Sequence, residues 1–249
     1  MEALVGFNAA QVAAALVAAF GAAYVRGLAG FGMAILLVPV LALAMTPVEA
    51  VLVTNGVSIL VGFSDMRMIL RNAERSAWTI IAGVVVATGP GLWLLSITPN
   101  GVARLLIALV ALSAFAVILL PRRSAAMPGR IHTVATGLAT GTLGGFAGMP
   151  GPPVVPYYVG REIPRAVAKA SMLLVFTAAS VTGVVSGAVI GVLEPEYLLL
   201  SLLLFPAVLA GNWLGARKFG QVEDRAWRCF VALVLGATAV VAIGKLLAG

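Results

Sequence analysis

The sequence predicts an all-α polytopic membrane protein made of two inverted repeats, each a broken-helix hairpin plus three transmembrane helices. Three observations support this fold class. Of the 249 residues, 61% are hydrophobic and 10% are charged, whereas soluble domains are about 45–50% apolar and about 25% charged. The basic residues gather in short clusters between apolar stretches. A glycine-and-proline interruption of the apolar sequence occurs twice, once in each half of the chain.

The apolar stretches are long enough for transmembrane helices, which need about 20 residues each. They cover residues 9–25, 30–63, 76–96, 101–120, 132–160, 165–192, 196–216 and 226–248. We interpret the first as a retained membrane segment, because the N-terminus lacks the basic region and cleavage site of a signal peptide. The two interrupted segments, 9–45 and 132–160, are the predicted hairpins, either re-entrant or fully spanning. The six predicted full spans are 47–63, 76–96, 101–120, 165–192, 196–216 and 226–248.

The interruption has one pattern in both copies. Each reads leucine, a small residue, glycine and phenylalanine, then glycine and methionine, then two prolines eight residues apart. These are residues 27–33 with Pro39 and Pro47, and residues 142–149 with Pro156 and Pro164. Together with further matches in the same order, they predict a duplication with halves 1–125 and 126–249. Matching breaks in two halves are typical of transporter binding sites, since irregular backbone at membrane depth must line a cavity or be buried.

The basic residues predict the orientation of the chain, because Lys and Arg favour the cytoplasmic side of short loops. Residues 96–101 carry no charge, and residues 193–196 carry only two glutamates, so we expect both loops outside. This path makes the halves antiparallel and places the N- and C-termini outside a bacterial inner (plasma) membrane. The clustered basic residues are Arg67, Arg71, Arg75, Arg122, Arg123, Arg130, Arg161, Arg165, Lys169, Arg217, Lys218, Arg225 and Arg228.

Arg26 is the first candidate binding residue, because it is predicted to lie far from both loop layers. A charge at mid-membrane costs about 2.5–3.5 kcal/mol or more and usually faces a cavity or a partner. Its planar guanidinium suits oxyanions. The alternative is that Arg26 snorkels to the interface or caps the first half-helix.

The remaining candidates lie at the breaks and on the helices that follow them. Glycines at the breaks let backbone N–H groups approach an anion, although small residues also serve helix packing. Thr54 and Ser171 each lie seven residues after the second proline of their copy, and hydroxyls there either bind substrate or bond to neighbouring backbone. The predicted substrate-binding set is completed by Gly30, Phe31, Gly32, Asn55, Gly145 and Gly148.

The sequence predicts no catalytic residue, cofactor, metal site or nucleic-acid partner. One cysteine, Cys229, excludes an internal disulfide and a cysteine-based metal site. The single histidine, His132, has no nucleophile motif to serve. The net charge of +7 is explained by the basic loops. The expected partners are a small anion and the lipid bilayer, and a homo-oligomer is left open.

The chain resembles the TauE/SafE family of sulfite-exporter-like membrane permeases. The resemblance rests on residues 26–34 with Val38, Pro39, Pro47 and Ala50, and on residues 142–156 with Pro164, Ala168 and Ser171. It implies a secondary transporter, in the export direction, for sulfite, organosulfonates or other small sulfur-containing anions. A carrier for a carboxylate or a metal ion is the leading alternative. An intramembrane enzyme or a structural membrane protein is disfavoured by the missing catalytic motifs and by the repeated break.

Overall fold

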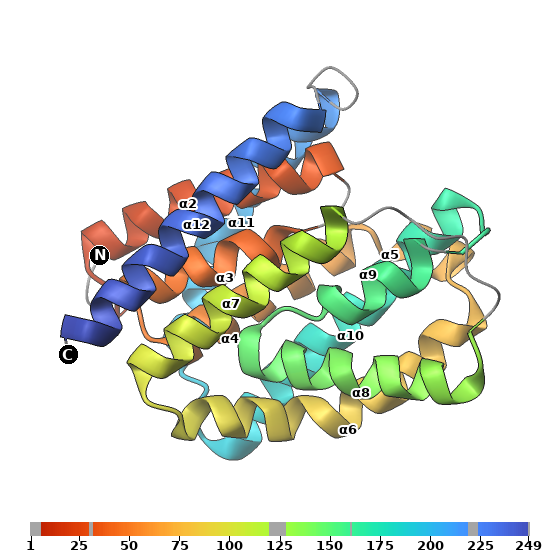
Figure 1. The fold of residues 1–249 in the computed structure, drawn as a ribbon, viewed down its shortest axis with the longest axis horizontal. Coiled ribbons are helices and arrows are strands. Elements are labelled where there is room, and N and C mark those ends of the chain that lie inside the picture. The colour runs from red at the N-terminus through yellow and green to blue at the C-terminus, as the bar shows by residue number, and fades with distance from the viewer. Residues whose placement is uncertain (1–5, 30–31, 120–127, 160, 219–223, 249) are drawn as a thin grey trace.

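The computed structural model describes residues 6–29, 32–119, 128–159, 161–218 and 224–248, and the regular structure in these segments is entirely α-helical. This confirms the predicted fold class (Figure 1). The helices are α2 (Ala9–Ala29), α3 (Met33–Ala44), α4 (Pro47–Ser64), α5 (Met66–Asn72), α6 (Arg75–Ile97), α7 (Asn100–Leu119), α8 (Arg130–Ala147), α9 (Gly151–Val159), α10 (Arg165–Ile190), α11 (Pro195–Arg217) and α12 (Asp224–Ala248).

The six predicted full spans correspond to α4, α6, α7, α10, α11 and α12, with ends that differ by no more than two residues. In the described part of the chain, five segments are long and apolar enough to cross a membrane: Ala9–Leu28, Pro47–Ser64, Arg75–Ile97, Arg165–Ile190 and Pro195–Arg217. Many of their large apolar side chains are exposed, Trp78, Val86 and Trp93 among them. A bilayer would cover these side chains.

The two predicted hairpins each consist of a long helix and a short one. α2 has 21 residues and α8 has 18, whereas α3 has 12 and α9 has nine. At 1.5 Å per residue, α3 is about 18 Å long, well short of the roughly 30 Å hydrocarbon core. Of these four helices, only α2 is both long and apolar enough to be among the segments that could cross a membrane. α5 was not expected: the sequence placed it in a loop, yet it is helical and buries Ile69.

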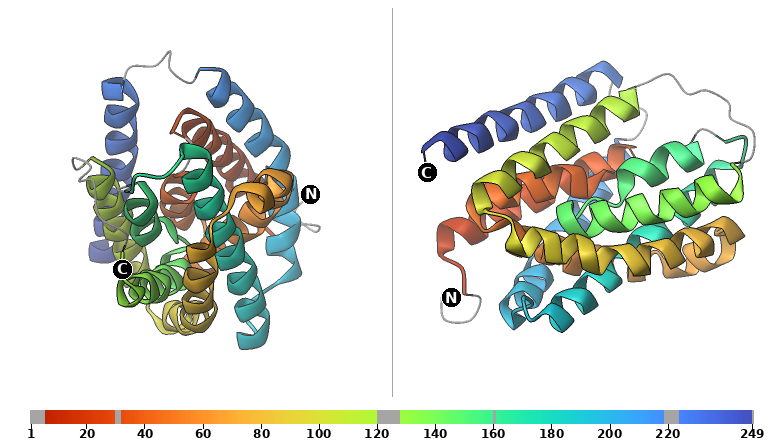
Figure 2. Two further views of the ribbon diagram at one scale, coloured as in Figure 1. Left: turned by 90° about the vertical axis from the view of Figure 1, so that its right-hand side faces the viewer. Right: turned by 60° about the horizontal axis from the view of Figure 1, so that its bottom comes forward.

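Both ends of the described chain lie at one end of the bundle, together with the α6–α7 turn, and α5 lies at the other (Figures 1 and 2). Contacts agree with this arrangement: the Phe7 and Tyr197 ring centroids are 6.1 Å apart, and Lys245 Nζ donates to the carbonyl oxygen of Leu43 at 2.7 Å. That the end carrying both termini faces outside remains a prediction.

The first helix of each predicted half packs along the last helix but one of the other half, α2 on α11 and α8 on α6. Glycines permit both contacts. A Cβ built on Gly215 would lie 2.1 Å from the Tyr24 carbonyl oxygen, and one built on Gly145 would lie 2.1 Å from that of Thr88. Two inverted repeats would produce this reciprocal packing of each half on the other, although the duplication itself stays a prediction. α4 and α10 pack against each other, α4 also contacts α11, and α10 also contacts α6.

Side chains from three other helices fix the C-terminal end of α3. Arg104 Nε donates to the Ala42 carbonyl at 2.6 Å, Gln11 Nε2 donates to that of Ala44 at 2.8 Å, and Lys245 bonds to Leu43 as above. These bonds satisfy carbonyls that a helix end leaves open, and the two cations offset its negative dipole. The half-helix is thereby held so that its N-terminus faces the second break.

Candidate functional site

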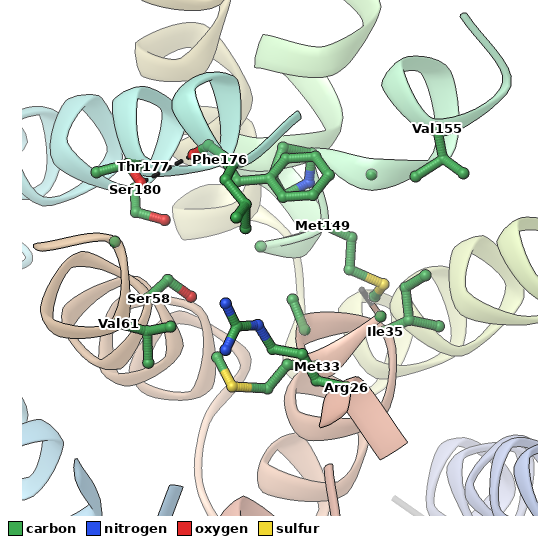
Figure 3. A pocket seen from close by; sticks show the side chains of 17 residues that line it. Arg26, Met33, Ile35, Ser58, Val61, Met149, Val155, Phe176, Thr177 and Ser180 are labelled. Atoms are coloured by element: carbon green, nitrogen blue, oxygen red, sulfur yellow. Dashed lines mark hydrogen bonds between the residues drawn. The ribbon is translucent and has the colours of Figure 1, made fainter. Parts of the chain in front are cut away.

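The two helix breaks form opposite walls of one cavity (Figure 3). The first break contributes the end of α2 and the start of α3, and the second contributes the α8–α9 junction. The last turns of α4 and the middle of α10 complete the wall. The lining residues are Arg26, Gly32, Met33, Ala34, Ile35, Ser58, Val61, Gly62, Gly148, Met149, Pro150, Gly151, Val155, Leu173, Phe176, Thr177 and Ser180.

The cavity has the size and lining of a site for a small molecule. Its volume is about 70 Å³, whereas one water molecule needs about 10–15 Å³ in the same measure. Most of the lining is apolar, with Met33, Met149 and Phe176 prominent. A few polar groups in an apolar wall are typical of binding sites, where they fix the orientation of the ligand.

Glycine in the left-handed conformation shapes the backbone at both breaks. Gly32, which precedes α3, has φ 96°, and Gly148, which ends α8, has φ 65°. At the second break the Gly148 N–H donates to the Gly144 carbonyl at 3.1 Å, so α8 ends in an αL motif. Only glycine adopts these angles without strain, which explains its recurrence in the two copies.

The start of α3 presents backbone donors to the cavity. Residues 32–35 line it, and no side chain of the described residues caps this helix end. The first N–H groups of a helix lack intrahelical partners and carry the positive end of the dipole, a combination that favours anions. In α9, by contrast, Pro152 and Pro153 remove two of the corresponding donors. The first break is therefore the better anion site.

Arg26 brings a positive charge to the same cavity. Its residue is only 8% exposed, and its guanidinium points into the space near Ser58 (Figure 3). The sequence predicts that such a charge faces a cavity or a partner, and Arg26 has both: Nη2 is 3.0 Å from Asp65 Oδ2, and Nη1 donates to Asn212 Oδ1 at 3.1 Å. These contacts hold the guanidinium in place and use two of its five N–H donors.

The structure brings only some of the predicted binding residues together. Arg26, Gly32 and Gly148 line the cavity, while Gly30 and Phe31 lie outside the described residues. Thr54 and Asn55 are buried in α4, on the face that leads to Ser58. Gly145 lies in the close contact of α8 with α6, and Ser171 Oγ accepts a hydrogen bond from the Glu74 N–H at 3.0 Å. Neither of these two lines the cavity.

Three polar cavity residues escaped the sequence prediction: Ser58, Thr177 and Ser180. For Ser58 a signal existed, because it lies one helical turn after Thr54 and Asn55 on the same helix. Thr177 and Ser180 had none, since nothing in the sequence pairs α10 with the end of α4. The two hydroxyls on α10 differ in whether they are available to bond to a ligand. The Thr177 hydroxyl already donates to the Leu173 carbonyl at 2.9 Å, while Ser180 Oγ faces the cavity (Figure 3).

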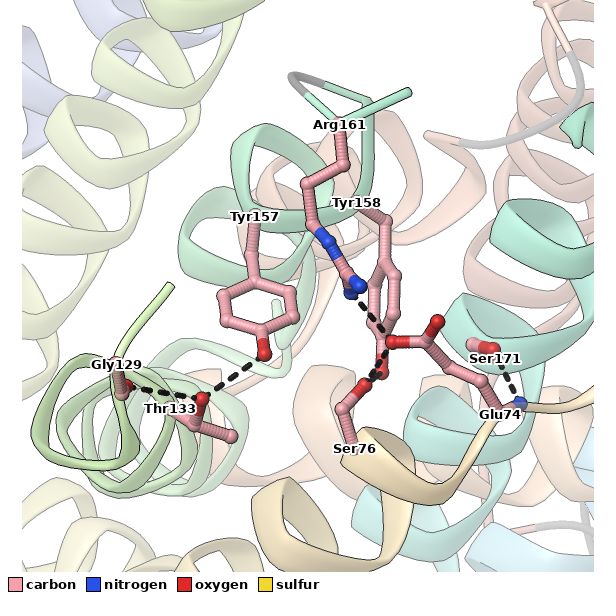
Figure 4. Close-up of polar contacts among 8 residues, drawn as sticks. All are labelled: Glu74, Ser76, Gly129, Thr133, Tyr157, Tyr158, Arg161 and Ser171. Atoms are coloured by element: carbon pink, nitrogen blue, oxygen red, sulfur yellow. Dashed lines mark hydrogen bonds and ion pairs between the residues drawn. The ribbon is translucent and has the colours of Figure 1, made fainter. Parts of the chain in front are cut away.

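A second polar cluster, also missed by the sequence, joins α9 to the start of α6 (Figure 4). Arg161 forms an ion pair with Glu74, and Ser76 bonds to Glu74 and, at 2.8 Å, to Tyr158. The Arg161 guanidinium also lies 5.9 Å from the Tyr158 ring centroid, within cation–π range. This cluster fixes the far end of α9, whose first turn lines the cavity.

A helical membrane bundle whose broken helices enclose a cavity of this kind belongs to the class of membrane transport proteins. The family model described as "Sulfite exporter TauE/SafE" matches residues 15–242. The chain therefore belongs to the TauE/SafE family, a family of membrane transporters, as its sequence resemblance indicated. No curated protein and no solved structure matches the chain. In the described part of the chain, no three His, Cys, Asp or Glu side chains form a group that could hold a metal ion.

Proposed function

We propose that the protein is a secondary transporter that exports a small sulfur-containing anion, such as sulfite or an organosulfonate, through the cavity between the two helix breaks. One observation carries the proposal: the Arg26 guanidinium and the uncapped N-terminus of α3 line the same cavity. Both favour negative charge. The family supports a sulfur oxyanion over other anions.

The recognition chemistry follows from the donors at hand. Sulfite and sulfonate groups present several oxygens, and a guanidinium offers donors in a planar fork that can meet two of them. Asp65 sets the orientation of Arg26 and lowers the net positive charge at the cavity. An entering anion therefore competes with Asp65, which keeps affinity moderate and lets the substrate leave again. Ser58 and Ser180 can add hydroxyl donors.

The proposed direction follows from membrane energetics. An inside-negative potential drives an anion outward with about 2.3 kcal/mol per charge for each 100 mV. The predicted orientation places the α5 end of the bundle, near the cavity, in the cytoplasm. The sequence places Glu49 at the outer end of its span, as the nearest candidate for proton coupling, and its carboxylate accepts a hydrogen bond from the Thr46 N–H at 2.8 Å in a capping box. It is thereby assigned to helix capping, and export would not need proton coupling.

Transport by purified protein in liposomes tests the proposal. Vesicles loaded separately with sulfite, sulfate, sulfoacetate, taurine or succinate are given a fixed membrane potential, and efflux is followed. We expect saturable efflux of sulfite or a sulfonate that is lost in Arg26→Ala. Preferred efflux of succinate would reassign the carrier to carboxylates, and the absence of any anion efflux would refute the function. A pH gradient that drives uphill anion movement by itself would refute the uncoupled mechanism.

A further inference from the structure

The polar lining of the cavity continues along the contact between α4 and α10. The two helices run antiparallel, so successive turns meet in order. A Cβ built on Gly62 would lie 2.2 Å from Thr177 Oγ1, at the cavity. Further from the α5 end, a Cβ built on Gly183 would lie 2.4 Å from Asn55 Nδ2, and one built on Gly187 would lie 2.9 Å from Leu52 Cδ2.

Thr54, Asn55 and Ser58 occupy one face of α4, since residues three and four apart are neighbours on a helix. Ser58 lines the cavity. Asn55 and Thr54 follow one turn beyond it, at 3% and 0% exposure. The next turn is apolar, with Val51 and Leu52 both fully buried. Thr54 and Asn55 are therefore the last polar groups on this face before an apolar layer.

Two donors on this face have no partner. Asn55 Nδ2 and Thr54 Oγ1 are buried and make no hydrogen bond within the described residues. Leaving a buried donor unpaired is costly, because the group has lost its bonds to water. Polar side chains inside membranes usually serve either as hydrogen-bonded contacts between helices or as parts of a substrate path. Without a bond across the contact, the first explanation does not account for Asn55.

We propose that Asn55 and Thr54 form a second anion position, between the cavity and the Pro47 end of α4. The proposal rests on the proposed function, because it assumes that an anion occupies the cavity. The Asn55 amide and the Thr54 hydroxyl donate to the oxyanion once α4 and α10 separate. Gly183 lets the Asn55 amide lie between the two helices, ready for that step. The apolar layer of Val51 and Leu52 closes the path beyond it.

The second position also explains how the cavity connects to the end of the bundle opposite α5. Toward the α5 end, Arg26 and Asp65 adjoin the cavity. In the other direction, Gly148 packs on Val38 and Val51, with a built Cβ 3.0 Å and 3.3 Å from their methyl groups. That wall is apolar at Gly148, whereas the α4–α10 contact holds the unpartnered amide of Asn55, with the Thr54 hydroxyl next to it on α4. A desolvated anion follows the path with donors, because unpaired charge in an apolar medium is strongly disfavoured.

Cysteine accessibility tests the path without requiring that the natural substrate be known. In a Cys229→Ser background, Ser58→Cys, Asn55→Cys and Thr140→Cys are each treated in liposomes with methanethiosulfonate ethylsulfonate, a thiol reagent that carries a sulfonate. Thr140 is the matched control, because its hydroxyl is equally buried and unpartnered but it lies on α8 and does not line the cavity. We expect reaction at positions 58 and 55, slowed by sulfoacetate, which unlike sulfite does not consume the reagent, and none at position 140.

A transport measurement separates this proposal from the function on which it rests. Asn55→Leu keeps the side-chain size and removes the donors; we expect sulfite binding within about threefold of wild type and efflux about tenfold slower or more. Thr140→Val should leave both unchanged. If position 55 is as unreactive as position 140 and Asn55→Leu exports normally, the second position is refuted while the cavity stands. If position 58 is also unreactive and wild type moves no anion, both proposals fall.

Discussion

The two helix breaks share a backbone but differ in chemistry. Each places a left-handed glycine at the cavity wall, Gly32 in the first and Gly148 in the second. The first break also brings the Arg26 guanidinium and an uncapped helix N-terminus to the cavity. At the second break, prolines replace backbone donors, and the arginine that follows α9, Arg161, is held away from the cavity by its ion pair with Glu74.

This difference indicates a division of labour between the two halves. A duplicated sequence can keep the same turn in both copies, because the turn depends on a few local residues. A positively charged side chain can then be kept in one copy only, because one bound anion needs one cationic partner. We infer that the first break binds the substrate and the second shapes and supports the cavity. Changes at the first should alter affinity, and changes at the second should alter stability.

The largest effect on sulfite affinity is expected from Arg26→Ala. Losing one charged contact to an anion typically costs about 1.5–3 kcal/mol, or roughly 10- to 150-fold in affinity. Arg26→Lys should be milder, because it keeps the charge and loses the planar fork. Sulfite binding measured by calorimetry on purified protein checks both variants.

The control for this change is the double variant Arg26→Ala/Asp65→Asn. Arg26→Ala alone leaves Asp65 without its partner, so lost affinity could reflect repulsion by that carboxylate. We expect the double variant to bind as weakly as the single one. Recovery of wild-type affinity in the double variant would mean that Arg26 only neutralises Asp65 and does not contact the anion.

A loss of stability without a loss of sulfite affinity is expected from Glu74→Gln. The Arg161 side chain is 5% exposed and that of Glu74 is 20% exposed, so Glu74→Gln leaves a mostly buried guanidinium without a counter-charge. Removing one partner of a buried ion pair lowers the free energy of unfolding by about 3–5 kcal/mol. Because Glu74 is partly exposed, we expect a smaller loss of roughly 1–3 kcal/mol. The thermal unfolding midpoint in detergent should fall, while the Kd for sulfite stays unchanged. A selective loss of affinity would contradict the division of labour.

The sequence predicted what depends on local residues. The helices follow from apolar length, and Arg26, Gly32 and Gly148 follow from the break pattern, because a turn needs glycine within a few residues. Contacts between distant residues could not be predicted: Arg26 and Asn212 are 186 positions apart, and Glu74 and Arg161 are 87 apart. α5 follows α4, and it has no counterpart after α10. Equivalent positions such as Thr54 and Ser171 therefore meet different neighbours.

A pair of glycine variants compares the two breaks directly. Alanine is strained by roughly 1–2 kcal/mol in the left-handed conformation at either position. At Gly148 the new methyl would also lie 3.0 Å from Val38, whereas at Gly32 it would meet open space. Crowding adds about 1–3 kcal/mol, so Gly148→Ala should lower the unfolding midpoint more. Gly32→Ala should weaken sulfite binding more, because its methyl enters the cavity beside the α3 donors. The reverse ranking in both measurements would overturn the comparison.

The smallest effect is expected from Ser171→Ala, which separates a binding role from a structural one. The Ser171 hydroxyl accepts from the Glu74 N–H, next to the start of α6. Losing a bond of this kind at a helix start costs about 0.5–2 kcal/mol. We therefore expect a slightly lower unfolding midpoint and unchanged sulfite affinity, with Ser180→Ala as the matched hydroxyl that lines the cavity. If Ser171→Ala weakens binding more than Ser180→Ala does, the substrate reaches α10 nearer its first turn, and the second half binds the anion as well as supporting the cavity.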